Sequence, residues 1–141
     1  MPQAQVSAEL RAQIHQLDQS RCAYCHTLVS LSIATFEIDH IIPQSVGGET
    51  IVDNLCLACP PCNRYKGTKQ QAIDPDTEQW VPLYHPRRQI WPVHFTWNDD
   101  WTVLIGLTPI GRVTITALRM NRPQMIRLRG TWKKSGLVYF P

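Results

Sequence analysis

Two C-x-x-C motifs, Cys22-x-x-Cys25 and Cys59-x-x-Cys62, constrain this chain more than any other feature, with 33 residues between them. Four thiolates are the number that a closed tetrahedral zinc site takes, and the short spacing lets one turn aim two sulfur atoms at one ion. A single C-x-x-C pair is also typical of thiol redox proteins, whereas two pairs favour structural zinc. The register stays open at this point, because Cys56 and Cys59 are also three residues apart.

The size and composition fit a small folded protein. With 141 residues, the chain is long enough for one compact domain and an extension, but not for two domains of ~100–200 residues each. Hydrophobic residues make up 43% and charged residues 18%, an ordinary globular balance. No apolar run approaches the ~20 residues of a membrane span, and the first residues lack the pattern of a signal peptide. We therefore expect a cytoplasmic protein without membrane contact, in which disulfides are not favoured.

The charges are distributed unevenly along the chain. All 11 acidic residues lie at or before Asp100, so residues 1–100 carry a net charge of −4 and the last 41 residues carry +7. The seven cations of this acid-free stretch are Arg112, Arg119, Arg122, Arg127, Arg129, Lys133 and Lys134. The asymmetry indicates a polyanionic partner, and its alternative is a solvated helix face balanced by the acidic part of the chain.

The first half reads as helix, strand, loop and helix. Ser7 is a plausible N-cap for a helix over 8–17, and the β-branched and apolar residues of 31–42 predict a strand that Pro43 ends. A turn follows at 46–48, and Asp53 or Asn54 is expected to cap a short helical turn. Prolines are tolerated in the first turn of a helix, so Pro60 and Pro61 predict the start of a second helix that contains Cys62 to Thr68.

The second half reads as an α+β extension. Residues 93–97 and 101–105 predict a β-hairpin, and Thr108 and Asn121 are expected to start helices that end near Met120 and Ser135. Five tryptophans in so small a chain are more often core residues than base-stacking ones. His94 could approach an active site or cap the hairpin, and both readings stay open.

Polar residues within the predicted strand are hard to explain by packing. Asp39 and His40 lie in an apolar run, and Asn63 follows Cys62 directly. The set that matters for comparison is Cys22-x-x-Cys25, Asp39-His40-Ile41-Ile42-Pro43, Gly47-Gly48, Asp53-Asn54-Leu55, Cys59-x-x-Cys62-Asn63 and Lys66-Gly67. In residue type, order and spacing this set resembles the HNH endonuclease family with its ββα-metal active site. It also resembles the HNH domain of RNA-guided CRISPR effector nucleases.

The resemblance implies a role for each residue of the motif. His40 matches the general base, Asp39 and Asn63 match the ligands of one catalytic Mg²⁺ or Mn²⁺, and Asn54 matches a residue that holds the loop of His40. Glu37 lies on the same strand face as Asp39 and is expected either to assist the cation or to act structurally. The family pattern also selects a zinc register of Cys22, Cys25, Cys59 and Cys62, with Cys56 as a small buried hydrophobe.

The fold class implied is therefore α+β: a ββα-metal HNH core with a zinc site over 1–72, and an extension of a hairpin and two helices over 73–141 packed on it. The function implied is a divalent-metal-dependent endonuclease that acts on DNA. Phosphate contacts are expected from Arg64, Lys66, Lys69 and Arg87. The alternatives are a non-catalytic zinc-knuckle module that binds nucleic acid and, less favoured, a thiol redox protein.

Overall fold

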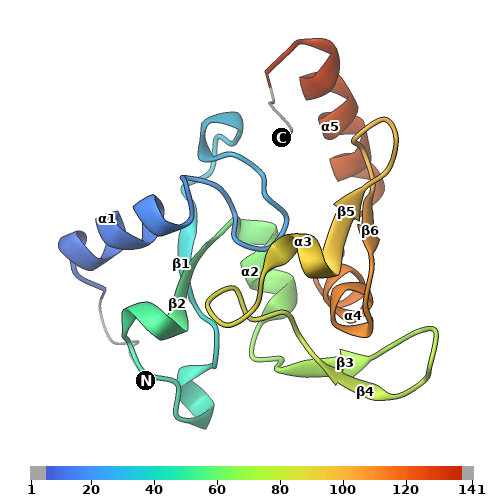
Figure 1. Ribbon diagram of the computed structural model, residues 1–141. Helices are drawn as coiled ribbons and strands as arrows, with labels where there is room; N and C mark the ends of the chain where they lie inside the picture. The colour runs from blue at the N-terminus through green and yellow to red at the C-terminus, as the bar shows by residue number, and fades with distance from the viewer. Residues whose placement is uncertain (1–5, 138–141) are drawn as a thin grey trace. The chain divides into compact units, whose positions relative to one another are not determined.

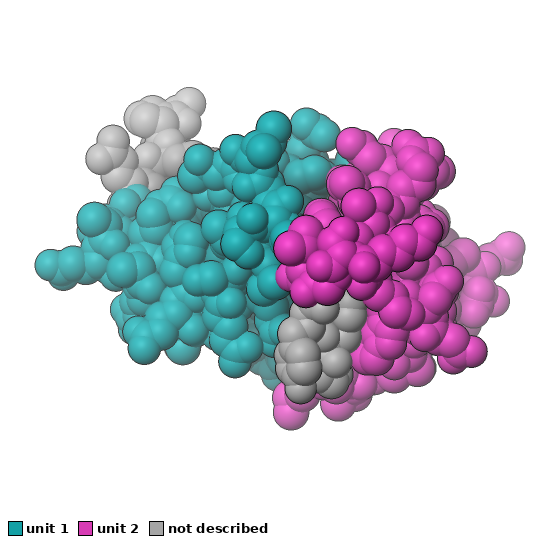
Figure 2. Space-filling model, turned by 90° about the horizontal axis from the view of Figure 1, so that it is seen from above, with its two compact units in different colours: residues 1–70, 85–89 teal, residues 71–84, 90–141 magenta. Residues whose placement is uncertain are grey.

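The computed structural model describes residues 6–137, which divide into two compact units (Figures 1 and 2). Unit 1 contains the chain up to Gln70 together with His85–Gln89, and unit 2 contains Gln71–Tyr84 and the chain from Ile90 onward. The chain thus leaves unit 1, returns to it for five residues, and leaves again. The domain boundary expected after residue 72 stays a prediction, and it did not anticipate the return of 85–89.

Unit 1 consists of one antiparallel pair of strands between two helices. Its regular elements are α1 (Ala8–Leu17), η1 (Val29–Leu31), β1 (Glu37–His40), η2 (Gln44–Val46), η3 (Val52–Asn54), β2 (Leu55–Ala58) and α2 (Pro60–Lys66). In the β1–β2 register, Asp39 lies opposite Cys56 and His40 opposite Leu55. Every residue of β2 is buried, with α1 packed against β2 and α2 against β1. Unit 1 therefore places the Asp39-His40 pair at the end of a strand, beside α2.

Both helices of unit 1 start as expected. The Ser7 hydroxyl accepts a hydrogen bond from the backbone N–H of Leu10 at 3.1 Å, which caps α1. Cys59 is the N-cap of α2, and Pro60 and Pro61 occupy its first turn. The helix ends at Lys66, two residues before Thr68, the last residue expected in it.

The strand predicted over 31–42 is wrong in its first half. Only Glu37–His40 pairs with another strand. Before it, Ser32 forms a local turn in which its hydroxyl both accepts from the N–H and donates to the carbonyl of Ala34, and the Ile33 side chain is fully exposed. Residue type favoured a long strand here, but a strand needs a partner, and β2 is only four residues long.

The cap predicted at Asp53 or Asn54 is also wrong. Both residues lie inside η3, whose N-cap is Ile51 without a side-chain hydrogen bond. The Asn54 side chain is used elsewhere, in the loop that follows β1. The short apolar strand β2 was not predicted, because four apolar residues between turns do not show a period.

Unit 2 contains two hairpins and three helices. Its elements are β3 (Gln71–Ile73), β4 (Trp80–Pro82), α3 (Trp91–His94), β5 (Phe95–Trp97), β6 (Leu104–Gly106), α4 (Pro109–Ala117) and α5 (Pro123–Lys134). Helix α4 packs against β6 and against the β3–β4 hairpin. The ring of Trp91 stacks on Phe95 at 5.1 Å, and Trp97 lies between Trp91 and Trp101. Four of the aromatic rings thus form a row along the β5 hairpin, which is a packing role.

The predicted hairpin and helices of unit 2 exist with shifted boundaries. Residues 93 and 94 belong to α3, and the connection between β5 and β6 is longer than three residues. Thr108 caps α4 as expected, by accepting from the N–H of Gly111 at 3.1 Å. Asn121 does not cap α5, since its side chain bonds both backbone groups of Leu104. The fold class is α+β, as predicted, and within residues 6–137 no helix has the length and apolar character to span a membrane.

Candidate functional site

The four predicted zinc ligands converge in unit 1. The Sγ atoms of Cys22, Cys25, Cys59 and Cys62 all lie within 4.8 Å of one another, and all four residues are buried. The Sγ atoms of Cys25 and Cys59, from different motifs, are 3.7 Å apart. Sulfur atoms ~2.3 Å from a tetrahedral zinc are about 3.8 Å from each other, so this donor set fits the ion. Since Cys59 and Cys62 lie at the start of α2, the cluster connects that helix to the turn that contains Cys22 and Cys25.

Cys56 lies outside this cluster, which resolves the register. It lies in β2, with its Sγ 3.9 Å from Oδ2 of Asp39. Burial, reinforced by the Asp39 charge, raises the pKa of the Cys56 thiol well above its ordinary value. The thiol is therefore neutral and behaves as the small buried group that the sequence indicated.

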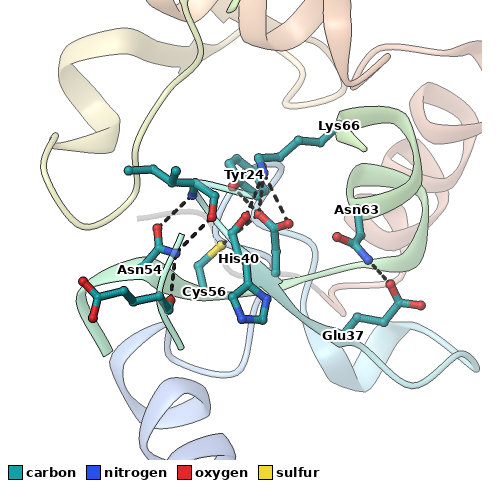
Figure 3. Close-up of polar contacts among 10 residues, drawn as sticks. Tyr24, Glu37, His40, Asn54, Cys56, Asn63 and Lys66 are labelled. Carbon is teal, nitrogen blue, oxygen red and sulfur yellow. Dashed lines mark hydrogen bonds and ion pairs between the residues drawn. The ribbon is translucent and has the colours of Figure 1, made fainter. Parts of the chain in front are cut away.

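Asp39 is almost completely enclosed and fully bonded. The Tyr24 hydroxyl donates to its Oδ2 at 2.7 Å, and Nζ of Lys66 lies 3.1 Å from Oδ2 and 3.3 Å from Oδ1 (Figure 3). Lys66 also donates to the carbonyl oxygen of His40 at 3.1 Å. Burial raises the pKa of Asp39, while the Lys66 charge and the Tyr24 hydrogen bond oppose that rise. In this arrangement Lys66 supplies the counter-charge of Asp39 and fixes the end of β1.

Glu37 and Asn63 form a second pair beside the first. The Asn63 side-chain N–H donates to Oε2 of Glu37 (Figure 3). Glu37 and Asp39 are two residues apart on β1, and Asn63 and Lys66 are three apart on α2, so each pair shares one face of its element. Among the described residues the amide oxygen of Asn63 has no hydrogen-bond partner. This face of β1 therefore presents two carboxylates toward an amide and an ammonium of α2.

The imidazole of His40 lies apart from Asp39, as alternation along a strand requires. Its Nε2 is 2.9 Å from the Thr50 hydroxyl, in the loop after β1. Burial lowers the pKa of His40, more than the nearby Asp39 charge raises it. A lowered pKa keeps the ring neutral at neutral pH, which is the form that can accept a proton.

Asn54 fastens the loop that follows His40. Its Oδ1 accepts from the N–H of Ile42 at 2.8 Å, and its Nδ2 donates to the carbonyl oxygens of Ile42 and Glu49 at 3.0 and 2.9 Å. Gly48 permits this closure, because a Cβ there would overlap the carbonyl oxygen of Ile42. The loop-holding task expected of Asn54 agrees with these three bonds.

The residues expected to contact phosphate differ in their surroundings. Arg64 and Lys69 are exposed, whereas Lys66 is 1% exposed and points inward to Asp39. The Arg87 guanidinium forms a two-pronged ion pair with Asp18, with both N–O distances 2.8 Å. Lys66 and Arg87 therefore already have carboxylate partners, and contact of any of the four with phosphate stays a prediction.

The sequence analysis missed the partners of the central carboxylates. Tyr24 lies between Cys22 and Cys25, and neither Tyr24 nor Asp18 was predicted to take part in the site. Asp18 also accepts a hydrogen bond from the N–H of Leu57 at 2.8 Å, so with Arg87 it joins the return segment 85–89 to β2. No periodicity or motif signals contacts over such distances along the chain. In unit 2, Nδ1 of His94 lies 2.7 Å from the Thr108 hydroxyl, which favours the hairpin-cap reading of His94.

Unit 1 thus combines an antiparallel strand pair that carries Asp39 and His40, a helix that carries Asn63, and a four-cysteine cluster. Comparison with known proteins finds the same arrangement in one family: residues 22–69 match the model of the HNH endonuclease family. The matched segment contains both cysteine pairs, Asp39, His40, Asn54 and Asn63.

A relative is also found among curated proteins. The CRISPR-associated endonuclease Cas9 of Corynebacterium diphtheriae is 38% identical over 64 residues, which is 45% of this chain and 6% of that protein. The chain thus corresponds to a small part of its relative. No solved structure matches the chain. The comparisons support a nuclease role at the level of the family.

Proposed function

We propose that this protein is a divalent-cation-dependent endonuclease that hydrolyses phosphodiester bonds of DNA in the cytoplasm. The observation that carries the proposal is the arrangement around β1 and α2 within the HNH segment, where Asp39 and Asn63 offer oxygen atoms and His40 ends the strand as a neutral base. A module that only binds nucleic acid has no need of these three groups.

Asp39 and Asn63 would hold the catalytic Mg²⁺ or Mn²⁺. A carboxylate and an amide oxygen are the hard donors that such ions take, and the remaining positions stay open to water and to substrate oxygens. When bound, the cation supplies Lewis-acid polarisation of the phosphate and charge stabilisation of the leaving alkoxide. Lys66 contacts both Asp39 oxygens, so cation binding there requires the ammonium to give up at least one of these contacts.

His40 would act as the general base. Its neutral imidazole takes a proton from water, and the resulting hydroxide attacks phosphorus while the bond to the leaving oxygen breaks. Thr50 orients the ring through Nε2, and Asn54 holds the loop in which Thr50 and the chain after His40 lie. Zinc on the four cysteines would keep α2, with Asn63, in place relative to β1.

Plasmid cleavage with added Mg²⁺ tests the proposal. His40→Ala should lower the cleavage rate about 10²–10⁴-fold, because it removes the base without touching the Asp39 pair. His94→Ala is the matched control, since it deletes the imidazole of the other histidine–threonine pair, in unit 2, and should leave the rate close to that of the wild type. An undiminished rate in His40→Ala excludes the assigned base, and wild-type DNA binding without cleavage points to the non-catalytic module.

A further inference from the structure

The seven cations of the acid-free stretch do not share one role. Arg112 is paired with two carboxylates, with its guanidinium 2.9 Å from Asp74 and 3.1 Å from Asp76. Arg112 is the main cause that lowers the pKa of Asp74 to about 2. The Arg112 charge is therefore neutralised within unit 2.

The Arg129 side chain is also bonded within unit 2. It is 2% exposed, and it donates to the carbonyl oxygens of Thr102 and Met120 at 2.9 and 2.6 Å. Its guanidinium also lies over the ring of Trp97, 5.2 Å from the centroid. Arg129 joins α5 to the β5–β6 hairpin, and it cannot reach a partner outside the protein.

The outward side of α5 carries a continuous polar stripe. Met125 and Arg129 mark the buried side of this helix. The stripe consists of exposed residues at spacings of three, four and three, the pattern of one helix face: Gln124, Arg127, Thr131 and Lys134. Gln124, Arg127 and Lys134 offer hydrogen-bond donors and two of them are cationic, whereas the Thr131 hydroxyl donates to the carbonyl oxygen of Arg127 at 3.2 Å. No acidic residue lies within α5. Arg127 and Lys134 are about 10 Å apart along the helix axis, far enough to meet two separate phosphates.

We infer that this α5 stripe binds the phosphate backbone of duplex DNA, with Arg127 and Lys134 as the two phosphate contacts. The inference rests on the proposed function, which supplies the polyanion. Solvated protein surfaces ordinarily mix charges of both signs, whereas this one is cationic without an acid over the last 41 residues of the chain. The helix dipole explains cations in the last turn, but not Arg127 in the middle of the helix.

Lys133 provides an internal control. It is exposed and adjacent to Lys134, yet it lies a third of a turn away from the stripe. The pKa of Asp100 is lowered by its hydrogen bond from Thr102 first, and in smaller part by Lys133. The Lys133 charge thus acts toward an acid of its own unit. Lys133→Gln and Lys134→Gln remove the same charge from consecutive residues that face different directions.

The test is the binding of the full chain to a fluorescent DNA duplex, followed by anisotropy over a series of salt concentrations without added divalent cation. For each phosphate that a variant no longer neutralises, the slope of log K against log[salt] should fall in magnitude by ~0.9. Arg127→Gln and Lys134→Gln should each produce that change, the double variant should produce about twice the change, and Lys133→Gln should keep the wild-type slope.

Three results would overturn the inference. They are an unchanged slope in the double variant, an equal loss in Lys133→Gln, and a wild-type protein that does not bind the duplex. A double variant that loses binding only to vesicles containing phosphatidylglycerol would identify a lipid-facing surface instead and would also reject it. If the wild type cleaves DNA but the double variant keeps the wild-type slope, only the role of the α5 stripe is rejected. If the slopes change as expected but the wild type does not cleave DNA, only the proposed function is rejected.

Discussion

The two units differ in what holds them together. All five cysteines lie in unit 1 and all five tryptophans lie in unit 2. Each unit has only two-stranded sheets, which are marginal on their own in water. Unit 1 contains in addition a cysteine cluster that fits zinc, and unit 2 a row of neighbouring aromatic rings along its β5 hairpin. Two small cores with similar two-stranded sheets therefore rely on different side chains, clustered cysteines in unit 1 and packed aromatic rings in unit 2.

The buried cations of the two units differ in the groups to which they are bonded. Lys66 in unit 1 and Arg129 in unit 2 are both nearly inaccessible to solvent. Lys66 is paired with Asp39, a carboxylate that the proposed chemistry uses, whereas Arg129 is bonded to carbonyl and amide oxygens of the framework. A buried cation on a carboxylate can take part in exchange with another cation. A buried cation on backbone carbonyls serves only the fold.

Removing zinc should have the largest effect and should act on one unit. Structural zinc contributes ~10–16 kcal/mol of apparent binding energy to small domains, so Cys59→Ala or a strong chelator should unfold unit 1. Tryptophan emission reports on unit 2 alone, because no tryptophan lies in unit 1. We expect far-ultraviolet circular dichroism to lose part of its signal while tryptophan emission stays native. Elemental analysis should find one zinc per wild-type chain.

Cys56→Ala is the control for this experiment. It removes a buried thiol from β2 and leaves the four clustered sulfur atoms in place. Zinc content should stay at one per chain, with a stability loss on the order of 1 kcal/mol. If tryptophan emission were lost in step with circular dichroism, unit 2 would depend on the metal too, and the two units would not be stabilised separately.

The cysteine cluster was also the part of the site that could be read most fully from the sequence. Cysteine spacing indicates which residues can share a metal, and the four cysteines that it selected do cluster. The caps at Ser7 and Thr108 are local signals of the same kind. The interior around Asp39 could not be read in this way. Lys66 looked like a surface cation of α2, since sequence gives helix position without showing which side another segment covers.

Strand boundaries failed for a related reason. The apolar run over 31–42 has strand propensity throughout, but β1 starts only at Glu37, opposite the last residue of β2, and β2 gave no periodic signal. Likewise, nothing local in 85–89 indicates that Arg87 returns to Asp18. Local chemistry predicts ligands and caps, whereas pairing partners depend on contacts between distant segments.

Replacing the two buried cations should have intermediate effects on the free energy of unfolding. Lys66→Met leaves Asp39 buried without its counter-charge and should cost about 3–5 kcal/mol of unfolding free energy at pH 7. Arg129→Met leaves carbonyl groups without donors and should cost about 1–3 kcal/mol for each buried group left unsatisfied. Urea denaturation followed by circular dichroism measures both. We expect cleavage under folding conditions to suffer only in Lys66→Met.

The pH dependence separates the two variants further. Burial already raises the pKa of Asp39, and loss of Lys66 raises it more, so the folded variant prefers the protonated carboxyl. The loss of unfolding free energy in Lys66→Met, relative to the wild type, should therefore be present at neutral pH and shrink as pH falls toward the ordinary pKa of Asp39. Arg129→Met involves no carboxylate and should keep a constant deficit. A Lys66→Met deficit that is the same at pH 7 and pH 5 would contradict the assigned ion pair.

The smallest expected effect concerns the two histidine–threonine pairs, one in each unit. Burial lowers the pKa of His40 from 6.5, so the imidazole becomes half protonated, and the base half lost, only below that pH. The acid limb of kcat/KM for cleavage, measured at saturating Mg²⁺, should therefore have its midpoint below pH 6.5, with activity rising as pH increases through it. His94→Ala should keep this limb, because its imidazole caps a hairpin at Thr108. The residual activity of His40→Ala should lack this acid limb. A midpoint above pH 6.5 in the wild type would mean that another group provides the base.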